Sequence, residues 1–249
     1  MKITGITDRA RVRRENQDAF YTWQGDGAAL GVVCDGMGGA QAGNVASAIA
    51  AQRFVEVLSD MPGQPPQRLK RALELANLAV FQRSRSDPSC RGMGTTLVAA
   101  FAKEDVAHIL NVGDSRCYHL SAGSVRQVSR DHSLVEELVA LGRITPEQAR
   151  VHPNRNIITR ALGTEHQIQG DLFVVELHPG DRLLLCSDGL SNEVEDRELL
   201  SLMAPTLEES CQSLLALALE RGAPDNVTVV LLEAEEAAEN VTNERQSDQ

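Results

Sequence analysis

The chain has 249 residues, of which 42% are hydrophobic, so it is long enough to bury a sizeable core. Its formal net charge of −11 argues against nucleic acid or an anionic membrane as a partner, because both call for a basic surface. The five cysteines are odd in number and include no Cys-x-x-Cys pair, which is typical of buried free thiols in a reducing compartment. With no signal-peptide pattern and no apolar run near membrane-helix length, we expect a cytoplasmic protein.

The first third of the chain predicts strands followed by two long helices. Alternating or continuous apolar runs predict strands at 2–7, 19–23 and 28–34. The last two strands are joined by a Gly-Asp-Gly turn, which predicts a hairpin. Apolar residues then recur at helical spacing over 41–58 and 67–85.

Strands return in the rest of the chain, with short helices between them. The expected strands are 94–102, 106–112, 117–120, 125–128, 168–176, 181–186 and 226–232. A short helix is expected at 132–141, and a second begins at Thr145-Pro146, where a threonine N-cap precedes proline at the first helical position and Gln148 at the third. A polar loop over 150–163 and helices at 195–203 and 206–221 complete the pattern.

This order of elements indicates an α+β fold. The strands form hairpins and the helices come in pairs, so a parallel sheet with alternating helices is disfavoured. We expect antiparallel sheets with helices on their outer faces, in one domain over residues 1–233. Residues 234–249 are acidic and are expected to form a disordered tail.

Five aspartates stand beside apolar runs, each within two residues of a glycine or an asparagine: Asp18, Asp35, Asp114, Asp188 and Asp225. Any one of them could belong to an ordinary turn, since Asp-Gly is a common turn dipeptide. Five carboxylates cannot share a mouth without cations, however, because like charges a few ångströms apart repel or force protonation. Oxygen ligands without a neighbouring set of Cys or His favour Mg²⁺ or Mn²⁺.

Such a site suggests phosphate chemistry. A pair of divalent ions lowers the pKa of a bridging water and clamps an in-line displacement. An arginine is then expected for the phosphate, because its planar fork matches two phosphate oxygens. Arg13 is the candidate, with Arg11 and Arg14 beside it, and a solvated surface role for Arg13 stays open.

A series of short motifs resembles the metal-dependent Ser/Thr protein phosphatases of the PP2C (PPM) family, in their compact bacterial form. They are Val12-Arg13 with Asn16-Gln17-Asp18, Cys34-Asp35-Gly36-Met37-Gly38-Gly39, Gly92-Met93-Gly94-Thr95-Thr96, Asn111-Val112-Gly113-Asp114-Ser115-Arg116, Asp131-His132-Ser133, Asn156-Ile157-Ile158-Thr159-Arg160-Ala161-Leu162-Gly163, Cys186-Ser187-Asp188-Gly189-Leu190 and Asp225-Asn226-Val227-Thr228. Each motif is weak alone, but together they extend over roughly residues 3–232 in order.

The resemblance implies a four-layer αββα sandwich, in which two central antiparallel sheets are flanked by helix pairs. It also implies two Mn²⁺ or Mg²⁺ ions per subunit, with the position of a third, weaker ion that bacterial members hold. The implied roles are Asp35 bridging two ions, Gly36 ligating through its carbonyl, Asp188 and Asp225 completing the first site, Asp18 serving the second through water, Asp114 with Asp188 at the third, and Arg13 holding the phosphate. Residues 141–160 correspond to the flap beside the active site, which influences substrate choice.

One position departs from the pattern. Bacterial members usually carry a histidine directly after the Gly-Met-Gly-Gly turn, proposed to protonate the leaving oxygen, and here that residue is Ala40. We expect a metal-bound water, or His152 from the flap, to serve as the acid. His132 is expected to be structural rather than catalytic.

Three interpretations follow from the sequence. The first is a monomeric phosphoprotein phosphatase that counteracts a Ser/Thr protein kinase, with the kinase and its targets as substrates. The second is a catalytically weakened member that binds phosphoproteins as a regulator, which Ala40 favours and the complete aspartate set opposes. The third is a related phosphatase within a stress-signalling partner switch.

Overall fold

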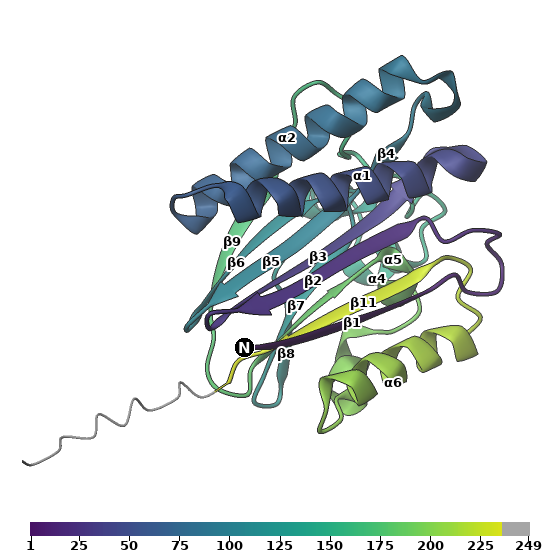
Figure 1. Cartoon of the computed structure of the whole chain (residues 1–249). Coiled ribbons are helices and arrows are strands. Elements are labelled where there is room, and N and C mark those ends of the chain that lie inside the picture. Colours follow the sequence, from purple (N-terminus) through teal and green to yellow (C-terminus); the bar gives the residue numbers. More distant parts are fainter. Residues whose placement is uncertain (236–249) are drawn as a thin grey trace, which may run out of the picture.

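The computed structural model describes residues 1–235, except for the side chains of residues 39–41 (Figure 1). The expected acidic tail therefore lies almost wholly outside the described residues. Among those that are described, no helix has both the length and the apolar character needed to cross a membrane.

Two antiparallel sheets lie face to face at the centre of the molecule (Figure 1). The first has the order β1 (Lys2–Asp8), β11 (Val227–Glu233), β10 (Arg182–Cys186), β7 (Arg116–Ser121) and β8 (Ser124–Gln127). The second has the order β2 (Asp18–Gly25), β3 (Ala28–Met37), β5 (Leu97–Lys103), β6 (Val106–Val112) and β9 (Asp171–Glu176), with β4 (Gly94–Thr95) paired to β3. The first and last strands in the sequence, β1 and β11, pair with each other.

The alternation of side chains along the strands builds the layers. In β3, Leu30 and Val32 face α1 (Gly39–Asp60) and α2 (Pro65–Ser86), whereas Ala29 and Val33 face the other sheet. Because side chains alternate between the two faces of a strand, a strand covered on both sides must be apolar throughout. This explains why β3 is a continuous apolar run.

The first sheet is covered on its outer face by α6 (Leu207–Glu220), together with α5 (Asp188–Ser191) and the 3-10 segment η2 (Asp196–Leu202) (Figure 1). The chain therefore has the four-layer αββα arrangement that the resemblance implied. The outer layer on this side is less regular than a pair of long helices, since η2 replaces the α-helix expected at 195–203.

Three local expectations are corrected by the structure. β3 does not end before Asp35 but continues to Met37, because β4 pairs with its last residues. The strand expected at 94–102 is divided at Thr96, whose side chain bonds to neighbouring segments instead. Asp188 does not simply follow a strand: it is the first residue of α5, a helix too short for its periodicity to be recognised.

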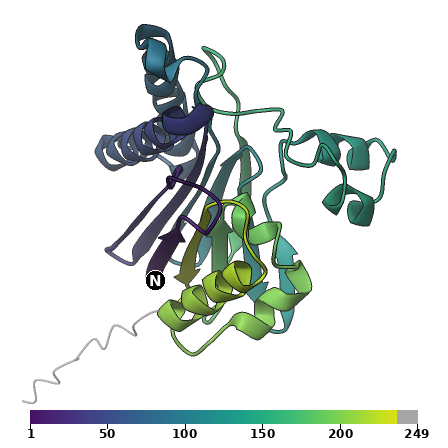
Figure 2. The ribbon, with the colours of Figure 1, turned by 90° about the vertical axis from the view of Figure 1, so that its right-hand side faces the viewer.

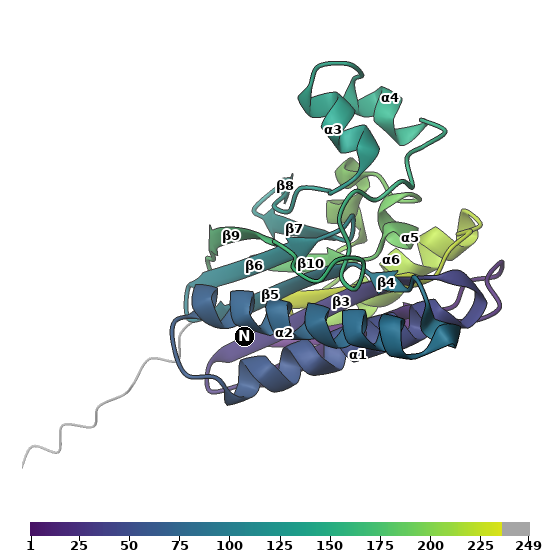
Figure 3. The same cartoon turned by 90° about the horizontal axis from the view of Figure 1, so that it is seen from above.

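The connection between β8 and β9 extends away from the body of the molecule (Figures 2 and 3). It contains α3 (Leu134–Ala140) and α4 (Pro146–Arg150). The short 3-10 segment η1 (Pro88–Cys90) lies elsewhere, between α2 and β4. The capping box predicted at the start of α4 is confirmed, with Thr145 and Gln148 bonded reciprocally. The stretch expected to be the flap, residues 141–160, lies in this projection.

Candidate metal centre

The five aspartates come from separate elements that end at the same edge of the two sheets. Asp18 is the first residue of β2 and pairs in register with Asp35 of β3. Asp114 lies between β6 and β7, Asp188 begins α5, and Asp225 precedes β11. A cleft of about 660 Å³ opens there, and Asp35, Asp114, Asp188 and Asp225 line it. Asp18 lies next to these residues with its carboxylate buried.

Hydrogen bonds to the backbone hold Asp35 in place. Its N–H donates to Thr96 Oγ1 over 2.8 Å, and its carbonyl accepts from the Thr96 N–H and the Thr95 hydroxyl, each over 2.9 Å. Thr96 Oγ1 also lies 2.7 Å from Ser115 Oγ, next to Asp114. The backbone of Asp35, and not its carboxylate, therefore holds this part of β3 in place.

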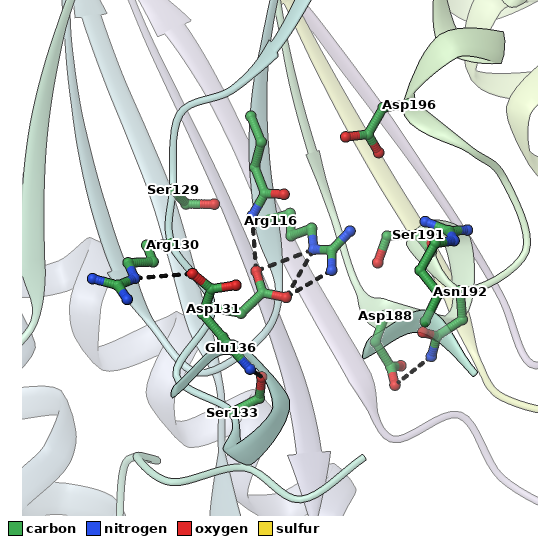
Figure 4. A network of polar contacts seen from close by, with 12 residues as sticks. Arg116, Ser129, Arg130, Asp131, Ser133, Glu136, Asp188, Ser191, Asn192 and Asp196 are labelled. Carbon is green, nitrogen blue, oxygen red and sulfur yellow. Dashed lines mark hydrogen bonds and ion pairs between the residues drawn. The ribbon is translucent and has the colours of Figure 1, made fainter. Parts of the chain in front are cut away.

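Asp18 is held by its carboxylate. Its Oδ2 accepts from the hydroxyls of Ser187 over 2.7 Å and Thr228 over 2.6 Å. Its Oδ1 is buried and has no hydrogen-bond partner among the described residues. The buried Oδ1 atoms of Asp114 and Asp188 also have no hydrogen-bond partner among the described residues. The other carboxylate oxygen of Asp188, Oδ2, accepts from Asn192 over 3.0 Å (Figure 4).

Two glycines allow the backbone to close around the site. A Cβ on Gly36 would lie 2.0 Å from the carbonyl oxygen of Gly43 in α1, and a Cβ on Gly189 would lie 2.0 Å from that of Asn226. Any side chain at either position would push apart the segments that carry Asp35, Asp188 and Asp225. Gly36 itself lines the cleft.

The electrostatics of the cleft oppose full ionisation. Burial, followed by repulsion from Asp188, raises the pKa of Asp18 to about 7. Burial and neighbouring carboxylates also raise the pKa of Asp35 and Asp114 well above their usual range, and that of Asp188. Divalent cations are the natural compensation for such a set of carboxylates.

The oxygen atoms in the cleft suit hard cations, but the side chains alone do not surround an ion completely. Oxygen donors line the cleft, and three buried carboxylate oxygens have no hydrogen-bond partner. Within residues 1–235, however, no three His, Cys, Asp or Glu side chains form a group that could hold a metal ion alone. Cations bound here would complete their coordination with water, as Mg²⁺ characteristically does.

Arg13 lies at the mouth of the cleft and is about half exposed. Its Nη2 donates to Asp225 Oδ2 over 2.6 Å, and this hydrogen bond raises the pKa of Arg13. Arg14 also lines the cleft, whereas Arg11 is exposed outside it.

Sequence reasoning missed the residues that support the aspartates. Asn226 accepts from the Gln17 N–H over 2.8 Å and donates to the carbonyls of Arg9 over 2.9 Å and Glu15 over 3.1 Å. It thereby fastens the polar segment between β1 and β2, which carries Arg13, beside Asp225. The signal was available, because Asn226 and Thr228 stand in the same short motif as Asp225.

The expected acid residues are less well supported. His152 accepts the Asn154 N–H at its Nδ1 over 3.1 Å, within its own turn, and it is not among the residues that line the cleft. Ala40 is the second residue of α1, and its side chain is not described. His132 is buried behind the loop that carries Asp114.

The sequence of this chain is similar to those of known phosphatases. A sequence profile of the family described as protein phosphatase 2C matches residues 7–221. The serine/threonine phosphatase Stp of Listeria monocytogenes is 39% identical over 235 residues, covering 91% of this chain and 93% of Stp. The serine/threonine protein phosphatase PstP of Mycobacterium tuberculosis is 42% identical over 233 residues, covering 93% of this chain. This chain spans 44% of the length of PstP.

Solved structures agree with the sequence comparison. The crystal structure of Staphylococcus aureus Stp1 aligns with a TM-score of 0.89 at 36% identity, covering 94% of this chain and 95% of Stp1. The PstP catalytic domain in complex with two manganese ions aligns with a TM-score of 0.83 at 39% identity, covering 93% of this chain and 97% of that domain. With matches of this extent in both sequence and structure, the chain belongs to the protein phosphatase 2C family.

Proposed function

We propose that this chain is a metal-dependent phosphoprotein phosphatase that hydrolyses phosphoserine and phosphothreonine. The observation that carries the proposal is the carboxylate cleft, in which buried Oδ1 atoms of Asp18, Asp114 and Asp188 have no hydrogen-bond partner among the described residues. Leaving such oxygens buried is costly, and a divalent cation would compensate for that cost. The names of the relatives Stp and PstP support the same activity.

The proposed cofactors are two Mn²⁺ or Mg²⁺ ions. Asp35 would bridge them, Gly36 would contribute its carbonyl, Asp188 and Asp225 would complete one site, and Asp18 would act on the other through water. Asp114 and Asp188 would hold a third, weaker ion. The two manganese ions bound by the PstP catalytic domain support this number. Bound there, the ions would lower the pKa of a water and neutralise the charge of the phosphate.

Arg13 would bind and orient the phosphate at the mouth. Its partial exposure leaves the guanidinium reachable from solvent, and its ion pair with Asp225 aims it across the cleft. A guanidinium can donate to two phosphate oxygens at once, which fixes the phosphorus for attack along one line. The hydrogen bonds from Ser187 and Thr228 to Asp18 Oδ2 favour its charged form and so partly offset the effect of burial, and a bound cation would complete this compensation.

Protonation of the leaving oxygen falls to water in this proposal. The described residues that line the cleft include no histidine, and His152 is bonded within its own turn. The same observation favours the second candidate function, a weakened member that binds phosphoproteins with little turnover. The proposed substrates are targets of a Ser/Thr protein kinase, and the kinase itself. A role in a partner switch would be decided by the preferred phosphoprotein.

The test compares p-nitrophenyl phosphate and a phosphothreonine peptide in Mn²⁺, Mg²⁺ and EDTA. We expect turnover that requires metal and is lost in Asp188→Asn. Asp26→Asn is the matched control, because Asp26 is exposed in the β2–β3 turn, away from the cleft. No turnover by the wild type in Mn²⁺, together with retained binding of the phosphopeptide, would favour the binding regulator instead.

A further inference from the structure

The loop that carries Asp114 is fastened at both ends by a single turn, residues 130–133. At the first end, the Gly113 N–H donates to His132 Nδ1 over 3.1 Å, and the His132 N–H donates to the Gly113 carbonyl over 2.9 Å. Asn111 strengthens this end by donating to the carbonyls of Gly113 and Arg130. These contacts fix the backbone directly before Asp114.

At the second end, Arg116 forms a forked ion pair with Asp131 (Figure 4). Its Nε lies 3.0 Å from Asp131 Oδ2 and its Nη2 lies 2.7 Å from the same oxygen. Gln127 donates to Asp131 Oδ1 over 2.8 Å, so the carboxylate is itself held. Asp114 therefore stands in a short loop whose flanking residues are both bonded to neighbours in one turn.

The backbone conformation at position 113 requires a glycine. Its φ of +101° is unfavourable for residues with a side chain, and a Cβ would lie 2.6 Å from Thr96 Cγ2. A glycine is flexible by nature, so an external contact must restrict it. His132, which is 7% exposed, supplies that contact.

The hydrogen bonds of His132 assign its tautomer. Because Nδ1 accepts the Gly113 N–H, the ring proton is on Nε2 and points to Asp171 Oδ2, 3.3 Å away, while Arg160 Nη1 lies 3.1 Å from the same nitrogen. The two ring nitrogens therefore contact different parts of the fold: Nδ1 contacts the Asp114 loop, and Nε2 lies beside Asp171 at the start of β9.

The same residue joins the base of the projecting segment to this loop. The Thr159 N–H donates to the His132 carbonyl over 2.8 Å, and Ser133 both caps α3 and pairs with Ile158. Both ends of the projection thus meet at the turn that holds Gly113.

We propose that His132 is a positioning residue for Asp114: its Nδ1 fixes Gly113 and thereby keeps the buried Asp114 carboxylate directed at the cation site in the cleft. The inference rests on the proposed function, in which Asp114 and Asp188 hold a third ion. Residues that orient metal ligands typically change metal affinity by roughly 10–100-fold when they are replaced.

Two variants separate the ring nitrogens. In His132→Asn, the amide Oδ1 takes the place of Nδ1 and can accept from Gly113, while the contact with Asp171 is lost. In His132→Gln, the amide reaches toward the place of Nε2, and the acceptor for Gly113 is displaced. Asp171→Asn keeps the ring and the Nδ1 contact with Gly113, and it changes only the surroundings of Nε2, including the ion pair of Asp171 with Arg160. His178→Gln, at an exposed histidine, is the control.

The first measurement is hydrogen exchange of the Gly113 amide in metal-free protein, followed by Mn²⁺ titration calorimetry. We expect His132→Gln to lose protection of the Gly113 amide and to bind its weakest Mn²⁺ about tenfold less tightly or worse. His132→Asn, Asp171→Asn and the control should keep both properties.

Equal exchange and equal Mn²⁺ affinity in the Asn and Gln variants would overturn the inference. Should His132→Gln fail to fold, a loss of Gly113 protection in His132→Asn would overturn it as well. The exchange measurement needs no metal and no turnover. Failure of the proposed function would instead appear as an inactive wild type whose Gly113 amide is still protected.

Discussion

Arg13 and Asp225, 212 positions apart in the sequence, form an ion pair of 2.6 Å across the mouth of the cleft. Asp225 is an expected metal ligand, and Arg13 is the expected phosphate ligand. The ion pair between them therefore competes with metal binding at Asp225 and with phosphate binding at Arg13. A cation on Asp225 would release the guanidinium toward solvent and phosphate. The pair therefore favours binding of metal before binding of substrate.

Replacing Arg13 separates charge from geometry. Arg13→Lys keeps a cation beside Asp225 but loses the fork that matches two phosphate oxygens. We expect kcat/KM for a phosphothreonine peptide to fall by roughly 10–100-fold, the worth of one charged hydrogen bond. Mn²⁺ affinity, measured by calorimetry, should not fall. A parallel loss of Mn²⁺ binding would mean that Arg13 serves the metal site instead.

The raised pKa values predict how stability of the metal-free protein depends on pH. The pKa of Asp18 is raised to about 7, so between pH 4 and pH 7 the folded state binds more protons than the unfolded state. Stability in EDTA should therefore fall as the pH rises through this range and level off above it. Mn²⁺ should remove most of this slope, because the cation takes over from the proton.

The matching variant is Asp18→Asn, which cannot ionise. In EDTA at pH 8 it should unfold at a temperature roughly 4–8 °C above the wild type, corresponding to about 2 kcal/mol. The difference should vanish near pH 4, and Asp26→Asn should show none. Thermal melts followed by circular dichroism would measure it. A lower melting temperature for Asp18→Asn at pH 8 would show that the hydrogen bonds from Ser187 and Thr228 outweigh the cost of burial.

Apolar periodicity reports burial directly, so it allowed the hairpins, the two long helices and the antiparallel sheets with outer helices to be predicted. The four-layer arrangement itself was implied by the family resemblance. β3 illustrates this: its continuous apolar run follows from helices on one face and a sheet on the other. The hairpin of strands 19–23 and 28–34 was also predicted, and the structure extends it far enough to pair Asp18 with Asp35.

Polar residues that work between distant segments escaped prediction. Ser187, Thr96 and Asn226 act through hydrogen bonds to residues far away in the sequence. Apolar periodicity does not report such bonds, and only the place of these residues in the short motifs sets them apart from ordinary turn residues. The start of α5 at Asp188 was missed for a related reason, since four residues are too few to show helical periodicity. The ion pair of Arg13 with Asp225 likewise joins the two ends of the chain.

The missing acid at Ala40 can be tested by restoring it. In Ala40→His, turnover of a phosphothreonine peptide should rise by up to roughly 10²-fold, the usual worth of general acid catalysis. The p-nitrophenyl phosphate rate should change less, because its leaving group needs little protonation. His152→Ala should leave both rates unchanged, since His152 is outside the cleft lining. A peptide-specific loss in His152→Ala would return that residue to the role of acid.

Asn226 offers a test of whether the Arg13 segment must be fastened. Its side chain is 2% exposed and bonds to one backbone N–H and two backbone carbonyls. Asn77 of α2 is 1% exposed and makes the same set of bonds to the loop before β9. It accepts from the Gly163 N–H and donates to the carbonyls of Glu165 and His166. The two asparagines are therefore a matched pair in burial and bonding, one beside the cleft and one away from it.

Asn226→Ala and Asn77→Ala should both destabilise the fold by about 2–4 kcal/mol, because each leaves buried backbone groups without partners. Only Asn226→Ala should also raise KM for the phosphothreonine peptide, since the segment of Arg9 to Gln17 that carries Arg13 would no longer be held beside Asp225. Urea unfolding and steady-state kinetics at a temperature where both variants are folded would compare them. If KM rose equally in both, the effect would stem from general loosening of the fold, and the segment would need no anchor to place Arg13.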